Sequence, residues 1–307
     1  MRIHDRFAVH RSGAGFVAAL VMVTTIMPSV PVPAAEIAGH GASAKAPADA
    51  KVALAQELLG LSNMSPVLAG WRETLAQSSD FGQYGLGKET QARLMSCWRR
   101  AVLKSFDIKA AEQKLAALYA ERFKMSELKD LIALRHTPVG ERISLSERSF
   151  HARTSDTQRS MAWMIDAAAR LEQDRDRKAL IEAIAELGGG TKALTDALIN
   201  ISVSASIGAE AIKPAGQPRH SPAEIAAIVE QHRQQMWQHL DAVVVTQHEM
   251  LYEQLSLTDL GTLKAFMASE LGRRHTEVSL DAFNQLMRDE ALAIGAQFAT
   301  EWQSQDL

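Results

Sequence analysis

The chain is poor in the residues that cross-link or interrupt a fold. Only one of its 307 residues is cysteine, Cys97, and only nine are proline. A single cysteine cannot form an internal disulfide, which excludes a disulfide-stapled scaffold. The formal net charge of −3 excludes a strongly basic nucleic-acid-binding protein. With 47% hydrophobic and 22% charged residues, the composition is that of a globular chain.

Cys97 stands beside Leu94, Met95 and Trp98. These apolar neighbours favour a small buried hydrophobic side chain. A reactive nucleophile and an intermolecular disulfide are the alternatives.

The N-terminus has the order of a secretory signal peptide. Three arginines within the first 11 residues precede an uncharged apolar run over 13–27, and prolines then lead to Ala34 and Ala35. A basic start, an apolar run and small residues predict a signal peptide over residues 1–34, cleaved after Ala34 or one residue later. The run is shorter than the roughly 20 residues of a membrane anchor. It has no following cysteine for a lipid and no adjacent arginine pair, so we expect export by the general secretion route into the periplasm.

Residues 35–50 are rich in Ala, Gly, Pro and Ser and predict a flexible spacer. From Lys51 onward, apolar residues recur three or four positions apart, which predicts an all-α fold. Even the β-branched stretch 242–246 lies inside a longer helical pattern. The last helix is expected to bury one long stripe made of Leu280, Phe283, Met287, Ala291, Ile294, Phe298 and Trp302.

Two breaks interrupt the helical pattern. The glycines 188–190 predict a helix end after Leu187, with Thr191 as N-cap of the next helix. The segment 213–222 contains three prolines and predicts an exposed loop that ends with Ser221 as N-cap and Pro222 in the first turn.

An internal repeat is the most specific signal. Residues 121–142 align without gaps to residues 253–274, with six of 22 positions identical, and 55–60 resembles 183–188 at a similar offset. We expect two tandem helical repeats, over 51–175 and 176–307, forming a multi-helix bundle.

The aligned segment predicts a helical corner, in which one short helix ends and the next helix begins. Ser256 and Asp259 have the spacing of a capping box, which starts a short helix that ends near Ala268. Ser269 in the second copy, and Thr137 with Pro138 in the first, are expected to begin the next helix. Glycine follows at the same distance in both copies, as Gly140 and Gly272, where it allows two backbones to approach closely.

These residues resemble a known family. Phe123, Glu127-Leu128 and the run 137–140, Thr-Pro-Val-Gly, are similar to the motif of the exported bacterial domain-of-unknown-function family 2059. The resemblance covers about 50 residues in each half, and Lys124 and Glu270 depart from the motif's hydroxyl and proline. It implies an exported helical protein without an assigned activity, and it supplies no catalytic residue.

The histidines do not form a metal-binding pattern. His232 and His239 are seven positions apart, about 10.5 Å along a helix, and one ion cannot easily bind both. We interpret them and His248 as solvated or interface residues. His136 and His275 are expected near helix ends, where an imidazole can bind terminal carbonyls.

Other chemical motifs are missing. The order Gly-Gly-Gly-Thr-Lys over 188–192 is not that of a phosphate-binding loop, and no Gly-x-Ser-x-Gly occurs. The charged run 172–178 predicts an exposed segment where the two copies meet. The five tryptophans are expected to anchor the core: Trp71, Trp98, Trp163, Trp237 and Trp302. An apolar groove lined by residues 161–165 is an alternative for that segment.

The sequence therefore assigns no catalytic, cofactor-binding or metal-binding residue. It favours a non-enzymatic binding or scaffolding protein of the cell envelope, with an unidentified protein or an apolar ligand as partner, and it leaves a homodimer open. We expect no nucleic-acid partner and no membrane span after signal cleavage. The alternatives are a cell-envelope hydrolase, which needs converging carboxylates, His or Ser, and a carrier of an apolar ligand, which needs a cavity lined by Leu, Met and Trp.

Overall fold

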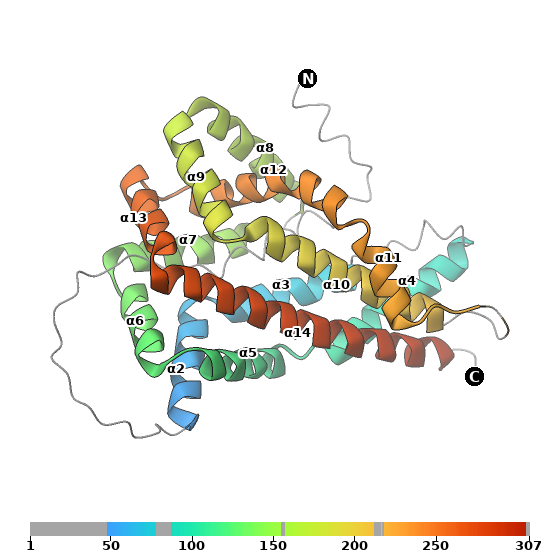
Figure 1. Cartoon of the computed structure of the whole chain (residues 1–307). Coiled ribbons are helices and arrows are strands. Elements are labelled where there is room, and N and C mark those ends of the chain that lie inside the picture. Colours follow the sequence, from blue (N-terminus) through green and yellow to red (C-terminus); the bar gives the residue numbers. More distant parts are fainter. Residues whose placement is uncertain (1–47, 78–86, 155–156, 212–215, 217, 305–307) are drawn as a thin grey trace.

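The computed structural model describes residues 48–77, 87–154, 157–211, 216 and 218–304, and every regular element in them is a helix. The predicted all-α fold is therefore confirmed (Figure 1). The helices are α2 (Ala48–Leu61), α3 (Met64–Gln77), α4 (Lys88–Ser105), α5 (Ile108–Arg122), α6 (Met125–Arg135), α7 (Pro138–Thr154), α8 (Thr157–Gln173), α9 (Arg175–Leu187), α10 (Gly190–Ala211), α11 (Pro222–Glu230), α12 (Arg233–Tyr252), α13 (Leu257–Ala268) and α14 (Glu270–Gln303).

The predicted signal peptide over 1–34 lies outside the described residues, as does most of the spacer. The prediction that the spacer extends to residue 50 is wrong, because α2 already begins at Ala48. Alanine has the highest helix propensity, and Asp49 in the first turn is favourable at a helix N-terminus.

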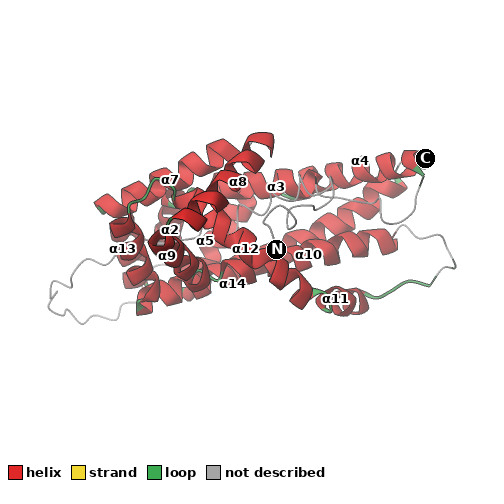
Figure 2. Ribbon diagram, turned by 90° about the horizontal axis from the view of Figure 1, so that it is seen from above, coloured by secondary structure: helices red, strands yellow, loops and turns green. Residues whose placement is uncertain are grey.

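Seen from above, the regular elements of the described residues are all helices (Figure 2). The helices of the two halves make corresponding contacts. Helix α2 packs on α5 and α6, as α9 packs on α12 and α13. Helix α3 packs on α4 and α5, as α10 packs on α11 and α12. The last part of each half crosses to the other half, since α7 packs on α12 while α14 packs on α4 and α5.

One difference separates the halves. Helix α14 runs unbroken for 34 residues, about 50 Å at 1.5 Å per residue. The corresponding stretch of the first half is divided into α7 and α8, and α8 packs against α12 and α9.

The two predicted corners have the same local geometry. The Ser256 side chain accepts a hydrogen bond from the Asp259 backbone N–H at 3.1 Å, which confirms the N-cap of α13. In the first corner Lys124 has no oxygen to cap α6, but the Glu127 carboxylate still accepts from the Lys124 backbone N–H at 2.6 Å. At the second junction Thr137 and Ser269 each accept from a glycine N–H three residues later, at 3.1 Å.

Those glycines lie against backbone, as predicted. A Cβ on Gly140 would overlap the carbonyl oxygen of Leu134. A Cβ on Gly272 would overlap the carbonyl oxygen of Phe266 and come within 2.8 Å of Met267 Cα. Leu134 and Phe266 are equivalent residues in the alignment, so the same close approach occurs in both corners.

Reciprocal ion pairs join the two corners. Arg142 of the first corner binds Asp259 of the second, with Nη2 2.5 Å from Oδ1. Arg274 of the second binds Glu127 of the first, with Nε 2.9 Å from Oε1. Because these four residues occupy two pairs of aligned positions, the corners contact each other through an approximately twofold arrangement.

One apolar core runs through both halves. Trp71 packs on Phe283 and Trp98 packs on Phe298, with ring centroids 5.7 and 5.8 Å apart, so aromatic residues of the first half hold α14. Cys97 is buried in this core, as expected. The prediction for Trp237 is wrong, because this side chain is 41% exposed near the start of α12.

The predicted N-cap role of Thr191 is also wrong. Helix α10 begins one residue earlier, at Gly190, because Gly189 takes a φ of +60° and reverses the chain there. The Thr191 hydroxyl donates instead to Asp241 on α12 at 3.0 Å. The other predicted cap is confirmed, since Ser221 forms a capping box with Glu224.

Two histidines are placed differently from the expectation. His248 is fully buried, with Nδ1 2.8 Å from the carbonyl oxygen of Val244. His275 is buried where α14 crosses α5, and its ring stacks on Phe123 at 5.9 Å. Burial lowers the pKa of His248 to about 4 and that of His275 to about 3. His136 is exposed at the C-terminus of α6, while the side chain of His239 lies outside the described residues.

Candidate functional site: a polar groove beside α14

A polar groove lies between α10, α14, the start of α12 and the end of α5. Its cavity volume is about 490 Å³, within the range of small-molecule sites. The lining residues are Arg122, Lys192, Asp196, Asn200, Arg233, Asp281, Asn284, Gln285, Arg288 and Asp289. All ten are polar, so the groove offers hydrogen bonds and charges of both signs.

The floor of the groove comes from one face of α14. Asp281, Asn284, Gln285 and Arg288 follow the spacing i, i+3, i+4, i+7, which places them on one helix surface. The buried apolar residues of the same helix, such as Phe283, point into the core. Amphipathic α14 therefore gives its apolar side to the core and part of its polar side to the groove.

One wall is organised around Asp196 on α10. Its carboxylate accepts from Lys192 Nζ at 2.6 Å, from Asn284 Nδ2 at 3.1 Å, and from Arg233. Burial opposes the charge of Asp196, but the hydrogen bonds from Lys192 and Arg233 outweigh it and lower the pKa of the carboxyl. Asp196 therefore already accepts three hydrogen bonds, which hold Lys192, Asn284 and Arg233 in position.

The end of α5 supplies Arg122. Its Nη2 donates to Gln285 Oε1 at 2.8 Å, and its carbonyl accepts from Arg274 Nη2 at 2.5 Å. Its Nη1 is buried without a hydrogen-bond partner among the described residues, and the same is true of Asn284 Oδ1. A buried polar atom without a partner costs free energy unless water or a ligand binds it.

Three charged residues at the groove keep their charges available. Asp281, Arg288 and Asp289 are exposed and make no ion pair with any described residue. The groove therefore combines prearranged, paired charges on α10 and α12 with free charges on α14.

The lining gives little support to catalysis. None of the ten lining residues is a serine, cysteine or histidine, so the groove holds no Ser–His or Cys–His pair, and its carboxylates are Asp196, Asp281 and Asp289. Among the described residues, no group of three His, Cys, Asp or Glu side chains is arranged to hold a metal ion.

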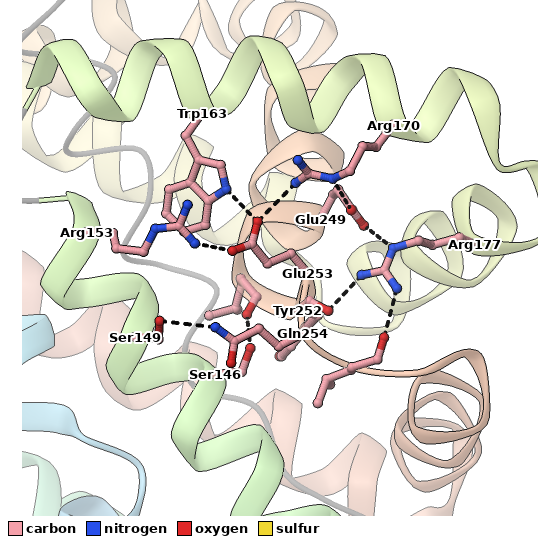
Figure 3. A network of polar contacts seen from close by, with 12 residues as sticks. Ser146, Ser149, Arg153, Trp163, Arg170, Arg177, Glu249, Tyr252, Glu253 and Gln254 are labelled. Carbon is pink, nitrogen blue, oxygen red and sulfur yellow. Dashed lines mark hydrogen bonds and ion pairs between the residues drawn. The ribbon is translucent and has the colours of Figure 1, made fainter.

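A second polar cluster joins α7, α8 and α9 to α12 (Figure 3). Glu249 accepts from Arg170 at 3.1 Å and from Arg177 at 2.7 Å. Glu253 accepts from Trp163 Nε1 at 2.7 Å and from Arg170 at 3.2 Å, and it also pairs with Arg153. Because these two carboxylates are shared among internal donors, the cluster is a structural clamp and not an open site.

Arg177 corrects the expectation for the charged run 172–178. Residues 172–176 are exposed as predicted, but the Arg177 side chain is only 12% exposed. It donates to the carbonyls of Tyr252 at 2.7 Å and Leu255 at 2.9 Å, at the C-terminus of α12. A guanidinium there satisfies terminal carbonyls and interacts favourably with the helix dipole.

A buried ion pair lies between α6 and α7. Arg135 Nη1 is 2.9 Å from Glu147 Oε2, and both side chains are excluded from solvent. Burial raises the pKa of Glu147 to about 7 against the opposing charge of Arg135. The burial of Tyr252, and the charge of Glu147, raise the pKa of that phenol. Arg135, Glu147 and Tyr252 are therefore polar side chains buried inside the helical bundle.

Sequence reasoning assigned no site residue and so missed the groove. Only the polar spacing on α14 could have indicated it, and such spacing is usual for a solvated helix face. Residues 161–165 do not line an apolar groove in the structure. Trp163 is buried in the clamp, and Ile165 is 54% exposed on the outside.

Fold and groove together define an all-α helical protein with a polar groove of mixed charge. Within the described residues, no helix combines the length and apolar character needed to cross a membrane. No protein-family model matches the chain, and comparisons with curated proteins and with solved structures find no match.

Proposed function

We propose that this chain is an exported, non-enzymatic protein of the bacterial periplasm that binds a small polar solute in the groove beside α14. The observation that carries the proposal is the 490 Å³ cavity with buried, unpartnered polar atoms on Arg122 and Asn284. A carrier of an apolar ligand is less well supported, because none of the ten described lining residues is Leu, Met or Trp. A hydrolase is less well supported because, among the described residues, no Ser, Cys or His lines the groove, and its carboxylate Asp196 is already paired with Lys192 and Arg233.

The proposal includes two tandem copies of one helical unit. It is supported by the matching contacts of α2, which packs on α5 and α6, and α9, which packs on α12 and α13. The two matching glycine contacts and the reciprocal ion pairs of Arg142 and Arg274 also support it. The resemblance to the exported family 2059 is part of the same proposal.

Export is tested by cell fractionation. We expect the mature protein in the osmotic-shock fluid, with an N-terminus that begins at Ala35 or Glu36. Recovery of the full-length chain in the membrane or the cytoplasm would contradict export.

Solute binding is tested by thermal unfolding with millimolar amino acids, peptides, sugars and organic acids. A ligand that binds only the folded state raises the melting temperature by mass action. Asn200 lines the groove and makes no hydrogen bond with a described residue, so Asn200→Trp should fill the cavity and abolish the shift. Gln113→Trp, on an exposed part of α5, is the matched control and should retain it. If no solute gives a shift that Asn200→Trp removes, the proposed function is wrong.

A further inference from the structure

We infer that the groove recognises short, hydrophilic peptides as zwitterions, binding the terminal ammonium near Asp281 and the terminal carboxylate near Arg288. This inference rests on the proposed function and names the ligand class of the same site.

The free charges of the groove have both signs. Asp281 and Arg288 make no ion pair with a described residue, so each can pair with a ligand group. A purely anionic ligand can pair with Arg288 but leaves Asp281 without a partner, and a purely cationic one can pair with Asp281 but leaves Arg288 without one. A singly charged ligand therefore uses only one of these two charges. A zwitterion compensates both signs.

The unpartnered buried atoms have the matching polarity. Arg122 Nη1 is a donor that can bind a carboxylate or a peptide carbonyl. Asn284 Oδ1 is an acceptor that can bind an ammonium or a peptide N–H. A peptide offers both kinds of group along its backbone, whereas a simple ion offers one.

The separation of Asp281 and Arg288 along α14 determines the length of peptide that fits. Asp281 and Arg288 are seven residues apart on α14, about 10.5 Å at 1.5 Å per residue. An extended peptide spans about 3.3–3.6 Å per residue, so three residues span about 10 Å. A tripeptide therefore matches the separation of the two residues along the axis of α14.

The residues that line the groove also limit which side chains a bound peptide can carry. None of the described residues that line the groove is apolar or aromatic, so they form no pocket for a large apolar side chain and no ring on which a sugar could stack. A neutral sugar would in addition leave the free charges uncompensated. Small or hydrophilic peptide residues fit this surface best.

Calorimetric titration with triglycine and its blocked forms tests the inference. Triglycine amide lacks the carboxylate, and N-acetyltriglycine lacks the ammonium. We expect triglycine to bind at millimolar concentration or better, and each blocked form to bind about tenfold more weakly, the equivalent of about 1.4 kcal/mol.

Two groove variants locate each terminus. In Arg288→Gln the preference for triglycine over its amide should disappear, while the preference over N-acetyltriglycine remains. In Asp281→Asn the opposite pattern is expected. Arg99→Gln and Asp166→Asn, at exposed positions on α4 and α8, are matched controls and should retain both preferences.

The inference is overturned if triglycine does not bind, if the blocked forms bind equally well, or if the variants lose both preferences alike. If another polar solute still gives a thermal shift that Asn200→Trp abolishes, only the peptide inference fails. If no solute does so, the proposed function fails as well.

Discussion

Replacing Gly272 by alanine should destabilise the protein strongly although it adds only one methyl group. That Cβ would overlap the Phe266 carbonyl oxygen and lie 2.8 Å from Met267 Cα. Both contacts are with backbone, which cannot rotate away as a side chain can. Overpacking in cores typically costs about 1–3 kcal/mol, and we expect the upper end here.

Such a loss should be visible in thermal unfolding. At about 2–4 °C per kcal/mol for a chain of this size class, Gly272→Ala should lower the melting temperature by about 6–12 °C. Gly140→Ala should act in the same direction, because its Cβ would overlap the Leu134 carbonyl oxygen.

Gly261 is the matched control on the neighbouring helix α13. A Cβ there has nothing within 4 Å, so alanine should stabilise the helix by about 0.5–1 kcal/mol through its higher propensity. Equal melting temperatures for Gly272→Ala and Gly261→Ala would refute the reasoning from close approach.

Three further predictions concern stability measured by urea denaturation. Ser256→Ala should cost about 1 kcal/mol, because it removes the cap of α13; an unchanged midpoint would count against the cap. Glu249→Gln should cost about 2 kcal/mol, because Arg170 and Arg177 lose a buried carboxylate, whereas Glu172→Gln in the exposed pair with Lys178 should leave the unfolding midpoint nearly unchanged. As the pH drops from about 6.5 to 4, the unfolded chain takes up protons that buried His275 and His248, with pKa values of about 3 and about 4, do not, which lowers stability; Glu147, with a pKa of about 7, opposes part of this fall. His275→Gln should flatten that pH dependence, and an unchanged slope would contradict the assignment.

Much of the local structure could be predicted from the sequence. The caps at Ser221 and Ser256 act through atoms three residues away, and the apolar stripe of α14 is a periodic pattern within one helix. The glycines of the corners also form a local signal, because the backbone that each one contacts lies only six residues earlier. Interactions between residues this close in the sequence can be recognised from the sequence pattern.

Pairings between distant segments leave no such pattern. The alignment showed that Arg142 and Arg274 are equivalent, but only the tertiary structure places each arginine on the opposite corner. The same applies to His248, whose burial depends on the helices packed around α12.

The groove is the clearest case. Arg122, Lys192, Arg233 and Asn284 come from four helices, and each alone is an ordinary polar residue on a helix surface. The sequence by itself determined the helices, their caps and their apolar faces, because those depend on neighbours within one or two turns. Only the tertiary structure decided which polar faces meet and which charges stay free, because that depends on how helices far apart in the chain pack together.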